Sequence, residues 1–364
     1  MPGFAGLLNF LSLNFRFLNF PSLNLPSLNP PFPMPILSGF RPADVQACAR
    51  HLAAGELVAF ATETVYGLGA NALDDAAVAR IFAAKGRPSS HPLIVHVASI
   101  EAALRFCPLP GSAARCLMAA FWPGPLTVIV PRQPGLATGA AGGQASIGLR
   151  MPAHPVALAL LREAAALGVW GVAAPSANRF GRVSPTTAAH VVGELGTELW
   201  VLDGGACDVG IESTIVDCTH EPPALLRPGQ LGADAVQQAL GRALGRPDAS
   251  SPRAPGTLLA HYAPGAALQL LPAADLSATL AGLSQAGQCI GVYSCHVPGP
   301  PGAVKVWRRM PDAAASAAHE LFGVLREFDA LGVHRILVEQ PPDTSDWDGV
   351  RDRLQRASTA AAAA

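Results

Sequence analysis

Two cations, Lys85 and Arg87, stand close to a polar, glycine-bearing turn in the first third of the chain. Residues 57–61 have the length and apolar composition of a buried strand, and they lead directly into that turn, residues 62–69. Loops that follow strands commonly carry the ligand site of α/β proteins. An arginine can contact a phosphate at two points, and a lysine adds a point charge. The pattern therefore predicts a polyphosphate-binding site.

A helix between the turn and the two cations is expected to position them. Asp74 or Asp75 suits its N-cap, an apolar face follows at Val78 and Ile81, and Gly86 suits its end. The cations would then project from the C-terminal end of this helix, beside the turn. The helix dipole alone also favours cations at this position, so the spacing by itself leaves a purely structural role open.

The composition bounds the class of protein. A chain of 364 residues, 50% apolar and 14% charged, can bury one or two substantial cores. The net charge of −1 gives no global field that would draw the protein to nucleic acid or to an acidic membrane. The seven cysteines include no C-x-x-C pair, and no apolar run reaches about 18 residues. We therefore expect a reduced, cytoplasmic protein without a membrane span.

Residues 1–37 differ from the rest of the chain. Asn recurs at every fifth position from Asn9 to Asn29, prolines cluster from 21 to 35, and Arg16 is the one charged residue. Such a low-complexity segment does not bury a core, and it lacks the basic start and the small-residue cleavage site of a signal peptide. We expect a disordered tail. Met34 is an alternative start, so whether residues 1–33 are translated stays open.

Residues 38–245 are expected to form an α+β domain on a mixed sheet. The predicted strands and helices follow one another without strict β-α alternation, which favours this class. Ser184 followed by Pro185 suggests the N-cap and first turn of a helix. The other expected elements are helices at 42–54, 155–166 and from 232, and strands at 93–97, 126–130, 147–150, 170–174, 199–202, 214–217 and 224–226.

The C-terminal part of the chain predicts a linker and a second domain. Residues 246–265 are rich in proline and glycine and end in H-Y-A-P, which is typical of a linker. Residues 266–356 alternate strands with helices, one of them amphipathic with Leu321 and Phe328 on its apolar face. This pattern predicts a small Rossmann-like, three-layer domain, whose role stays open. Residues 357–364 are expected to be a disordered tail.

Further phosphate-suited groups occur at element ends and turns, without an evident nucleophile or base. Each has a structural explanation when taken singly, since arginines flank strands and serines cap helices in many proteins. Nucleotidyl transfer relies mainly on positioning and charge neutralisation, so a cationic pocket with few titrating groups is its expected form. Neither a P-loop nor a complete dinucleotide fingerprint occurs. The groups are Arg150, Arg227, Ser176, Ser184, and the rings of Tyr66 and Tyr262, which can face a base.

Several blocks of the sequence resemble the YrdC/Sua5 family of threonylcarbamoyl-AMP synthases, in family order and over residues 42–355. The linker S-P-R-A-P-G-T-L-L-A-H-Y-A-P and the domain after it mark the longer, two-domain Sua5 type. Residues 341–354 match only weakly, and Ala61 replaces the usual proline before T-E-T. The matching blocks are T-E-T-V-Y-G-L-G, K-G-R-P, H-P-L-I-V-H-V, F-W-P-G-P-L-T, I-G-L-R-M-P-A-H-P, A-P-S-A-N-R-F-G, G-I-E-S-T-I-V-D and L-L-R-P-G.

The resemblance implies a YrdC-like twisted mixed sheet with a concave basic cavity. It also implies a nucleotidyltransferase that joins L-threonine, bicarbonate and ATP into L-threonylcarbamoyl-AMP and releases pyrophosphate. The product would pass to a downstream tRNA threonylcarbamoyltransferase for t6A modification at position 37 of tRNA. Direct tRNA binding by this chain is not indicated. The oligomeric state and the identity of the transferase stay open.

Matching the family motifs residue by residue implies three sets of site residues. The K-x-R and S-x-N pairs give the catalytic set, which is Lys85, Arg87, Ser176 and Asn178. The ATP set is Arg87, His91, Ser146, Ser176, Ser184, Arg227 and Tyr262, with Tyr262 of the linker closing over the nucleotide. The threonine set is Thr64, His96, Arg150, the backbone of Ala174, and Ser213.

Mg²⁺ arriving with ATP is the expected helper, because it bridges phosphate oxygens, keeps waters and needs few protein ligands. No organic cofactor is expected. The sequence shows no acidic metal cage, and the spacing of His91 and His96 without a third partner argues against zinc.

Three other functions compete with this interpretation. A non-catalytic RNA-binding module lacks support from any RNA-recognition motif or basic, aromatic-interleaved run. A carbamoylating maturase would resemble proteins that carry C-x-x-C zinc modules, which are absent from this sequence. A regulatory protein that uses only its C-terminal domain is the third alternative.

Overall fold

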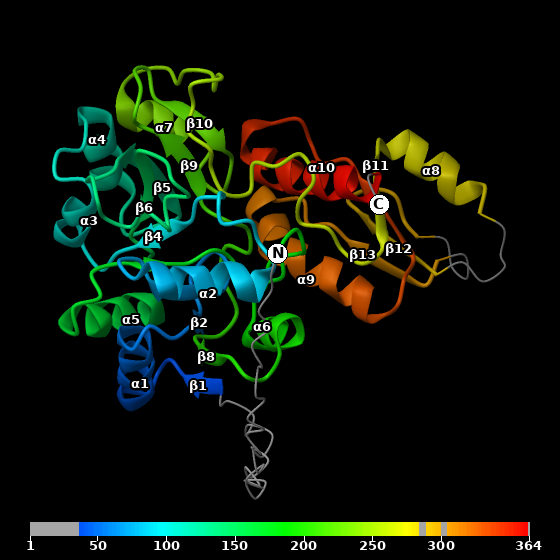
Figure 1. The fold of residues 1–364 in the computed structure, drawn as a ribbon. Helices are drawn as coiled ribbons and strands as arrows, with labels where there is room; N and C mark the ends of the chain where they lie inside the picture. The colour runs from blue at the N-terminus through cyan, green and yellow to red at the C-terminus, as the bar shows by residue number, and fades with distance from the viewer. Residues whose placement is uncertain (1–35, 284–288, 300–303, 363–364) are drawn as a thin grey trace, which may run out of the picture. The chain divides into compact units, whose positions relative to one another are not determined.

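The computed structural model describes residues 36–283, 289–299 and 304–362, and Figure 1 shows their helices and strands. The tail predicted at 1–37 lies outside the described residues up to position 35. Its last two positions belong to strand β1 (Ile36–Ser38), which pairs in parallel with β8 (Trp200–Asp203). The first described strand therefore begins two residues before the predicted start of the domain at 38.

A ten-stranded mixed sheet carries the first domain and confirms the predicted fold class. Its strand order is β1-β8-β2-β3-β7-β4-β6-β5-β9-β10, with both parallel and antiparallel neighbours. The other strands are β2 (Val58–Phe60), β3 (Gly67–Asn71), β4 (Ile94–His96), β5 (Leu126–Pro131), β6 (Ser146–Arg150), β7 (Val172–Ala173), β9 (Thr214–Asp217) and β10 (Ala224–Arg227). The helices are α1 (Pro42–Ala53), α2 (Asp75–Lys85), α3 (Ile100–Phe106), α4 (Ser112–Phe121), α5 (Pro155–Ala166), α6 (Ala188–Leu195) and α7 (Ala233–Leu240).

Strand β3 is an element that the sequence analysis missed. It runs antiparallel to β2, with Gly67 opposite Phe60, so the polar turn between them is only residues 61–66. A Cβ at Gly69 would lie 2.8 Å from both the Phe60 ring and the Val172 side chain. The glycines that suggested a loop therefore serve a strand, because they let a large ring pack flat against the backbone.

Helix α2 forms as its capping residues predicted. The Asp74 carboxylate accepts hydrogen bonds from the backbone N–H groups of Ala76 and Ala77, at 2.9 and 3.1 Å. Gly86 ends the helix with a left-handed φ of 62°, which glycine adopts without strain. This sharp end separates Lys85, the last helical residue, from Arg87.

The predicted helix at Ser184 is wrong in position. Helix α6 begins at Ala188, and Thr187 caps it by accepting from the backbone N–H of His190 at 3.2 Å. The Ser184 hydroxyl instead donates to the Glu212 carboxylate. Ser184 therefore bonds to a buried residue distant in sequence and does not cap a helix.

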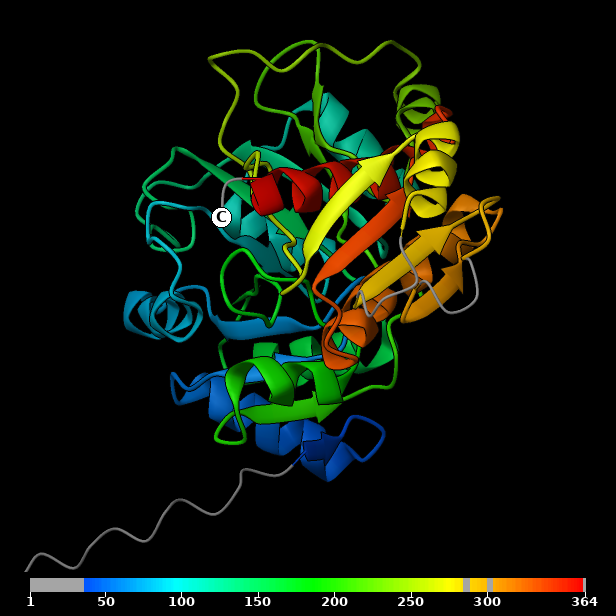
Figure 2. The ribbon, with the colours of Figure 1, turned by 90° about the vertical axis from the view of Figure 1, so that its right-hand side faces the viewer.

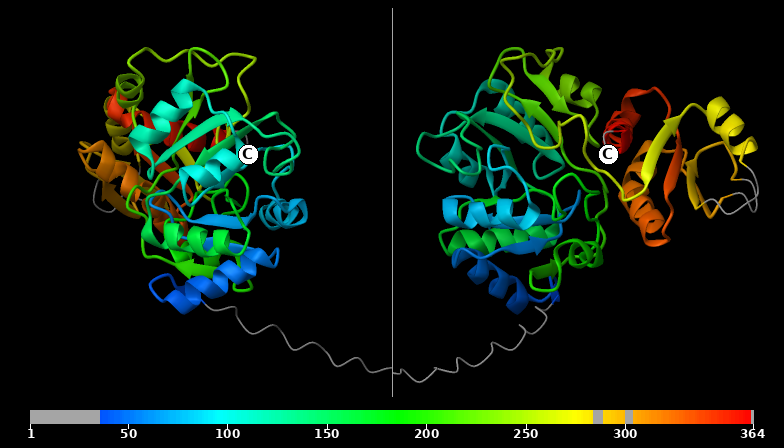
Figure 3. Two further views of the ribbon diagram at one scale, coloured as in Figure 1. Left: turned by 90° about the vertical axis from the view of Figure 1, so that its left-hand side faces the viewer. Right: turned by 45° about the vertical axis from the view of Figure 1, so that its right-hand side comes forward.

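The second domain is a four-stranded parallel sheet between two layers of helices, as predicted. The strand order is β11-β14-β12-β13. Side chains alternate along β14: Ile336 and Val338 pack in the core that contains α9, and Leu337 packs with α8. Figure 3 shows α8 and α9 on opposite sides of this sheet. The elements are β11 (Ala267–Leu271), α8 (Ala273–Ala281), β12 (Ile290–Ser294), β13 (Val306–Arg309), α9 (Ala314–Ala330), β14 (Arg335–Glu339), a 3-10 turn (Ser345–Trp347) and α10 (Asp348–Ala362).

Helix α10 lies along β11 (Figure 2). Its length shows that the predicted boundary of the C-terminal tail is wrong. It continues to Ala362, so residues 357–362 are helical where disorder was expected. Ala357 is fully buried in the core of the second domain, which explains why the helix extends this far. None of the helices in the described ranges is long and apolar enough to cross a bilayer.

Candidate active site

One pocket of the described structure gathers most of the predicted site residues. It encloses about 540 Å³ of space, part of which is open to solvent. Its walls come from the 61–66 turn, the start of β3, strands β4 and β6, residues 174–176 and 212–213, and the linker. All five residues of the predicted threonine set line it, together with four others. The nine are Thr64, Arg87, His96, Arg150, Ala174, Ser176, Ser213, Arg227 and Tyr262.

Five predicted residues do not line this pocket. His91 lines a neighbouring pocket that shares Arg87 and His261 with the first. Ser146 lies in two other cavities beside β5 and β6. Lys85, Asn178 and Ser184 are buried next to the pocket wall. Their predicted contacts with substrate therefore stay predictions.

Arg150 is the centre of a buried polar cluster. Its guanidinium donates to the Thr64 hydroxyl at 2.8 Å and forms an ion pair of 2.7 Å with Glu63. Burial favours the neutral acid, but the charge of Arg150 and its hydrogen bond outweigh that effect and hold the pKa of Glu63 below its usual range. The cluster thus presents a cation and an anion side by side.

His96 lies in the same wall and stays neutral at physiological pH. Its side chain is buried, and its Nδ1 has no hydrogen-bond partner among the described residues. Burial, reinforced by the charge of Arg150, lowers the pKa of His96 to about 3. A neutral imidazole can still exchange hydrogen bonds with a polar ligand.

Arg227 connects the sheet domain to the linker. It donates to the backbone oxygen of Ser213 at 2.8 Å and to that of Pro255 at 2.9 Å. It also donates to the Ser213 hydroxyl at 3.1 Å, which in turn is 2.8 Å from the Thr127 hydroxyl. The linker is therefore tied to the pocket floor by a buried cation.

Arg87 is buried at the end of α2 with part of its hydrogen-bonding capacity unused. Its guanidinium donates to the Pro92 carbonyl at 2.9 Å and lies 5.6 Å from the centre of the Phe180 ring. Its Nε has no partner among the described residues. Burial lowers the pKa of Arg87 to about 10, so the group remains a cation at neutral pH.

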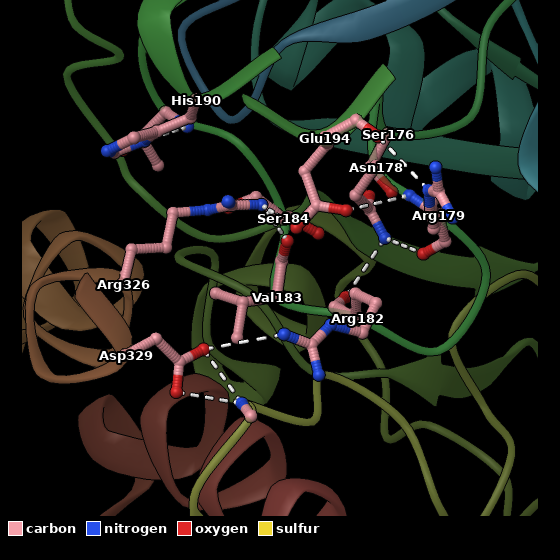
Figure 4. Close-up of polar contacts among 12 residues, drawn as sticks. Ser176, Asn178, Arg179, Arg182, Val183, Ser184, His190, Glu194, Arg326 and Asp329 are labelled. Atoms are coloured by element: carbon pink, nitrogen blue, oxygen red, sulfur yellow. Dashed lines mark hydrogen bonds and ion pairs between the residues drawn. The ribbon is translucent and has the colours of Figure 1, made fainter. Parts of the chain in front are cut away.

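Lys85 is committed to the turn that carries the predicted S-x-N pair. Its ammonium donates to the backbone oxygens of Ser176 and Asn178. The Asn178 amide donates to the backbone oxygens of Arg179 and Arg182, at 2.7 and 2.9 Å, and so closes the turn (Figure 4). Burial and the charge of Arg87 lower the pKa of Lys85 well below its usual value. In this structure, Lys85 positions Ser176 and does not face the cavity.

The linker supplies a ring to the pocket at an unusual backbone conformation. Tyr262 has a φ of 61°, in the left-handed region that tyrosine rarely adopts, and its side chain is buried. Its ring stacks on Phe322 of α9, with ring centres 5.5 Å apart. A Cβ at Gly256, whose φ is also positive, would lie 2.3 Å from the Tyr262 hydroxyl. The linker is shaped around this ring.

Tyr66, which the sequence offered as a base-stacking ring, is not available for that role. Its hydroxyl donates to Asp203 and to the Gly205 carbonyl, both at 2.7 Å, and its ring belongs to the main core. The sequence analysis missed three polar or charged residues that line the pocket, Thr62, Glu212 and His261, and also Glu63, the ion-pair partner of Arg150. Glu63 and Glu212 occur in the blocks T-E-T and G-I-E-S-T. The sequence did not indicate that each of these acids pairs with a buried arginine distant in the chain.

The described residues do not form a protein-held metal centre. No group of three or more His, Cys, Asp and Glu side chains suited to a metal ion occurs among them. Glu212, the acid that lines the pocket, is paired with Arg353, and nearby Glu63 is paired with Arg150. This donor set fits a Mg²⁺ ion that arrives with a polyphosphate and keeps its own waters.

Two family models match adjoining parts of the chain. One, described as "Telomere recombination" and covering the Sua5, YciO and YrdC proteins, matches residues 50–229. The other, the C-terminal domain of threonylcarbamoyl-AMP synthase, matches residues 229–359. They meet before α7, whereas the predicted linker begins at 246.

Curated relatives and solved structures match nearly the whole chain. The threonylcarbamoyl-AMP synthase of Pyrococcus abyssi is 37% identical over 326 residues, which is 86% of this chain and 94% of that protein. The enzyme of Bacillus subtilis is 38% identical, over 88% of this chain and 94% of that protein. A crystal structure of P. abyssi Sua5 complexed with L-threonine superposes with a TM-score of 0.80 at 34% identity, over 90% of this chain and 98% of that chain. This chain belongs to the Sua5 family of threonylcarbamoyl-AMP synthases.

Proposed function

We propose that this chain is itself a threonylcarbamoyl-AMP synthase, a nucleotidyltransferase that converts L-threonine, bicarbonate and ATP into L-threonylcarbamoyl-AMP and pyrophosphate. The observation that carries the proposal is the pocket. Three buried cations, Arg87, Arg150 and Arg227, line one cavity, and Arg150 is paired with the buried carboxylate of Glu63. The relatives named for this activity and the Sua5 complex with L-threonine support the proposal.

The Arg150 cluster suits the free amino acid. Threonine carries a carboxylate, and Arg150 in the cavity lining offers it the complementary charge. The hydroxyls of Thr64 and Ser213 and the neutral ring of His96 are available for its hydroxyl and for the carbamate that bicarbonate forms on its amine.

The part of the pocket lined by Arg87 and Arg227 suits the phosphates of a nucleotide. The carbamate oxygen attacks the α-phosphorus of ATP and pyrophosphate leaves. Buried guanidinium groups stabilise the charge that grows on the phosphate oxygens, because a water-excluded site strengthens such interactions. Lys85 supports this chemistry through the Ser176–Asn178 turn. Mg²⁺ bound to ATP adds its own charge neutralisation when present.

The product is a mixed anhydride, so it needs a transferase that moves the threonylcarbamoyl group to tRNA, for t6A at position 37. No direct tRNA contact by this chain is part of the proposal. A cytoplasmic setting is supported by the seven cysteines, all of which are free.

The test measures pyrophosphate release from ATP by protein that starts at Met34. Release is expected only when L-threonine and bicarbonate are both present, and omission of either should reduce it to background. If ATP is left intact, or if release does not depend on threonine, the proposal is refuted. The chain would then share the fold of the family but not its activity, and the RNA-binding alternative would be favoured.

A further inference from the structure

The C-terminal domain reaches the pocket without lining it. The described residues that line the cavity all lie in or before the linker, and Tyr262 is the last of them. Yet Arg353 of α10 extends from the C-terminal domain, and none of its side chain is exposed. A fully buried guanidinium needs several partners, because it loses all of its hydration.

Arg353 finds those partners in the pocket wall. Its Nε donates to the Glu212 carboxylate at 2.8 Å, and its two terminal nitrogens donate to the backbone oxygens of Glu212 and Pro228, at 3.2 and 2.9 Å. Its own neighbour Asp352 supplies a second carboxylate at 2.7 Å. One side chain of the second domain thus holds Glu212 by both its backbone and its carboxylate.

Glu212 transmits this contact to the cavity. It lines the pocket, and its other carboxylate oxygen accepts the hydroxyl proton of Ser184. Burial favours the neutral acid, but the charges of Arg353 and Arg227 and the hydrogen bonds from Ser184 and Arg353 outweigh it and lower the pKa of Glu212 to about 2. Glu212 is therefore an ionised carboxylate whose two oxygens are held by Arg353 and Ser184 and whose charge also interacts with that of Arg227.

The same guanidinium also supports the linker ring. Arg353 lies 5.2 Å from the centre of the Tyr262 ring, which is within the range of a cation–π interaction. Phe322 stacks on this ring as well. Arg353 thus affects two residues of the predicted ATP set. It contacts the Tyr262 ring directly, and it holds the Glu212 carboxylate that accepts the Ser184 hydrogen bond.

Asp329 and Arg326 also dock the two domains; Arg326 donates to the backbone oxygens of Val183 and Ser184, whereas the contacts of Asp329 lie away from Ser184. Asp329 of α9 pairs with Arg182 at 3.5 Å and accepts from the backbone N–H of Gly265, while Arg326 pairs with Glu194 at 3.1 Å (Figure 4). Within the described part of the chain, Asp329 forms no hydrogen bond or ion pair with Glu212 or Tyr262. A substitution of Asp329 should therefore weaken domain docking without disturbing Glu212 or Tyr262, and it can serve as a control.

We propose that Arg353 is a positioning residue of the nucleotide subsite, through which the C-terminal domain sets the ATP affinity of a pocket that it does not line. Arg353 fixes the Glu212 carboxylate and the Tyr262 ring. Without it, the buried Glu212 charge turns to Arg227 and withdraws that cation from the phosphates. That the nucleotide is ATP rests on the function proposed above.

The test measures the Kd for ATP by titration without threonine, and KM and kcat for pyrophosphate release, on the full chain. Arg353→Met should raise the Kd and KM for ATP by about tenfold or more, with a smaller change in kcat. Adding Glu212→Gln removes the orphaned charge, so the double variant should bind ATP at least about threefold more tightly than Arg353→Met alone. Arg353→Lys keeps a cation, so its Kd for ATP should lie between those of the unaltered protein and Arg353→Met.

Two controls separate the positioning role from weaker docking or from loss of fold. Arg351→Met alters an arginine of the same helix that pairs with Asp343 and Asp348 inside its own domain, and Asp329→Asn weakens docking elsewhere. Both should keep the Kd for ATP within about threefold of the unaltered protein.

Equal effects of Asp329→Asn and Arg353→Met would overturn the proposal, because docking alone would then explain them. An unchanged Kd in Arg353→Met, or no recovery in the double variant, would overturn it too. Failure of the proposed reaction is distinguishable, since it would show as no threonine-dependent pyrophosphate release by the unaltered protein while the ATP affinities of the variants still decide the role of Arg353.

Discussion

Arg150 and Glu63 form an ion pair of 2.7 Å in which neither side chain is more than 8% exposed. Removing one partner of a buried pair leaves an uncompensated charge, which commonly destabilises a protein by about 3–5 kcal/mol. We expect Glu63→Gln to reduce the free energy of unfolding by about 3 kcal/mol, somewhat less than a full truncation because glutamine can still accept a hydrogen bond. The measurement is the urea-unfolding midpoint.

The control for this pair is Glu56→Gln. Glu56 pairs with Arg80, and about half of each side chain is exposed, so the expected loss is about 1 kcal/mol or less. Equal losses in the two variants would mean that the buried pair adds no more to stability than a solvated one.

Arg87 should be required for turnover and not for folding. Its guanidinium lines the cavity, its Nε finds no partner within the described ranges, and a lysine cannot reproduce its planar contacts with phosphate. Arg87→Lys should lower kcat for pyrophosphate release by about a hundredfold, comparable to the loss of one transition-state donor. Arg80→Lys, an exposed position on the same helix, is the control and should keep nearly full activity. Near-normal turnover in Arg87→Lys would exclude Arg87 as a phosphate ligand.

The stability of the protein should fall as pH decreases from about 6.5 towards 5. Burial lowers the pKa of both His96 and His261 to about 3, whereas histidines of an unfolded chain titrate near 6.5. In this window the unfolded state binds more protons than the folded state, so acid favours unfolding. His96→Gln should reduce the slope of stability against pH by about one proton.

The matched control for the pH dependence is His334→Gln, because His334 is exposed. Unfolding midpoints at half-unit steps between pH 5 and 7 give the slopes, starting above the range in which carboxylates titrate. A slope that His96→Gln leaves unchanged would show that His96 is not buried in its neutral form.

Tyr262 should contribute to ATP retention through its ring and not through its hydroxyl. The ring stacks on Phe322 and faces the pocket. Tyr262→Ala should weaken ATP binding by about tenfold, since stacking on an aromatic ring is worth about 1–3 kcal/mol per base. Tyr262→Phe keeps the ring and should bind ATP nearly normally. Equal affinities of the alanine and phenylalanine variants would mean that the linker ring does not cover the nucleotide.

The sequence by itself determined the elements whose cause is local. Asp74 and Gly86 bound α2 because capping hydrogen bonds and a positive φ involve only neighbouring residues. The family motifs also identified nine of the residues that line the pocket.

Only the tertiary structure decided which polar groups meet. Thr64 and Arg150 are 86 positions apart, and Glu212 and Arg353 are 141 apart, so no local pattern relates them. Ser184 shows the conflict directly: its local signal was a helix cap, but burial gave it a carboxylate partner from a distant loop. Local hydrogen bonds and side-chain periodicity act within a few residues of the chain. The partners of a buried charge are chosen by packing, which forces every such group to find its counter-charge wherever the fold brings one.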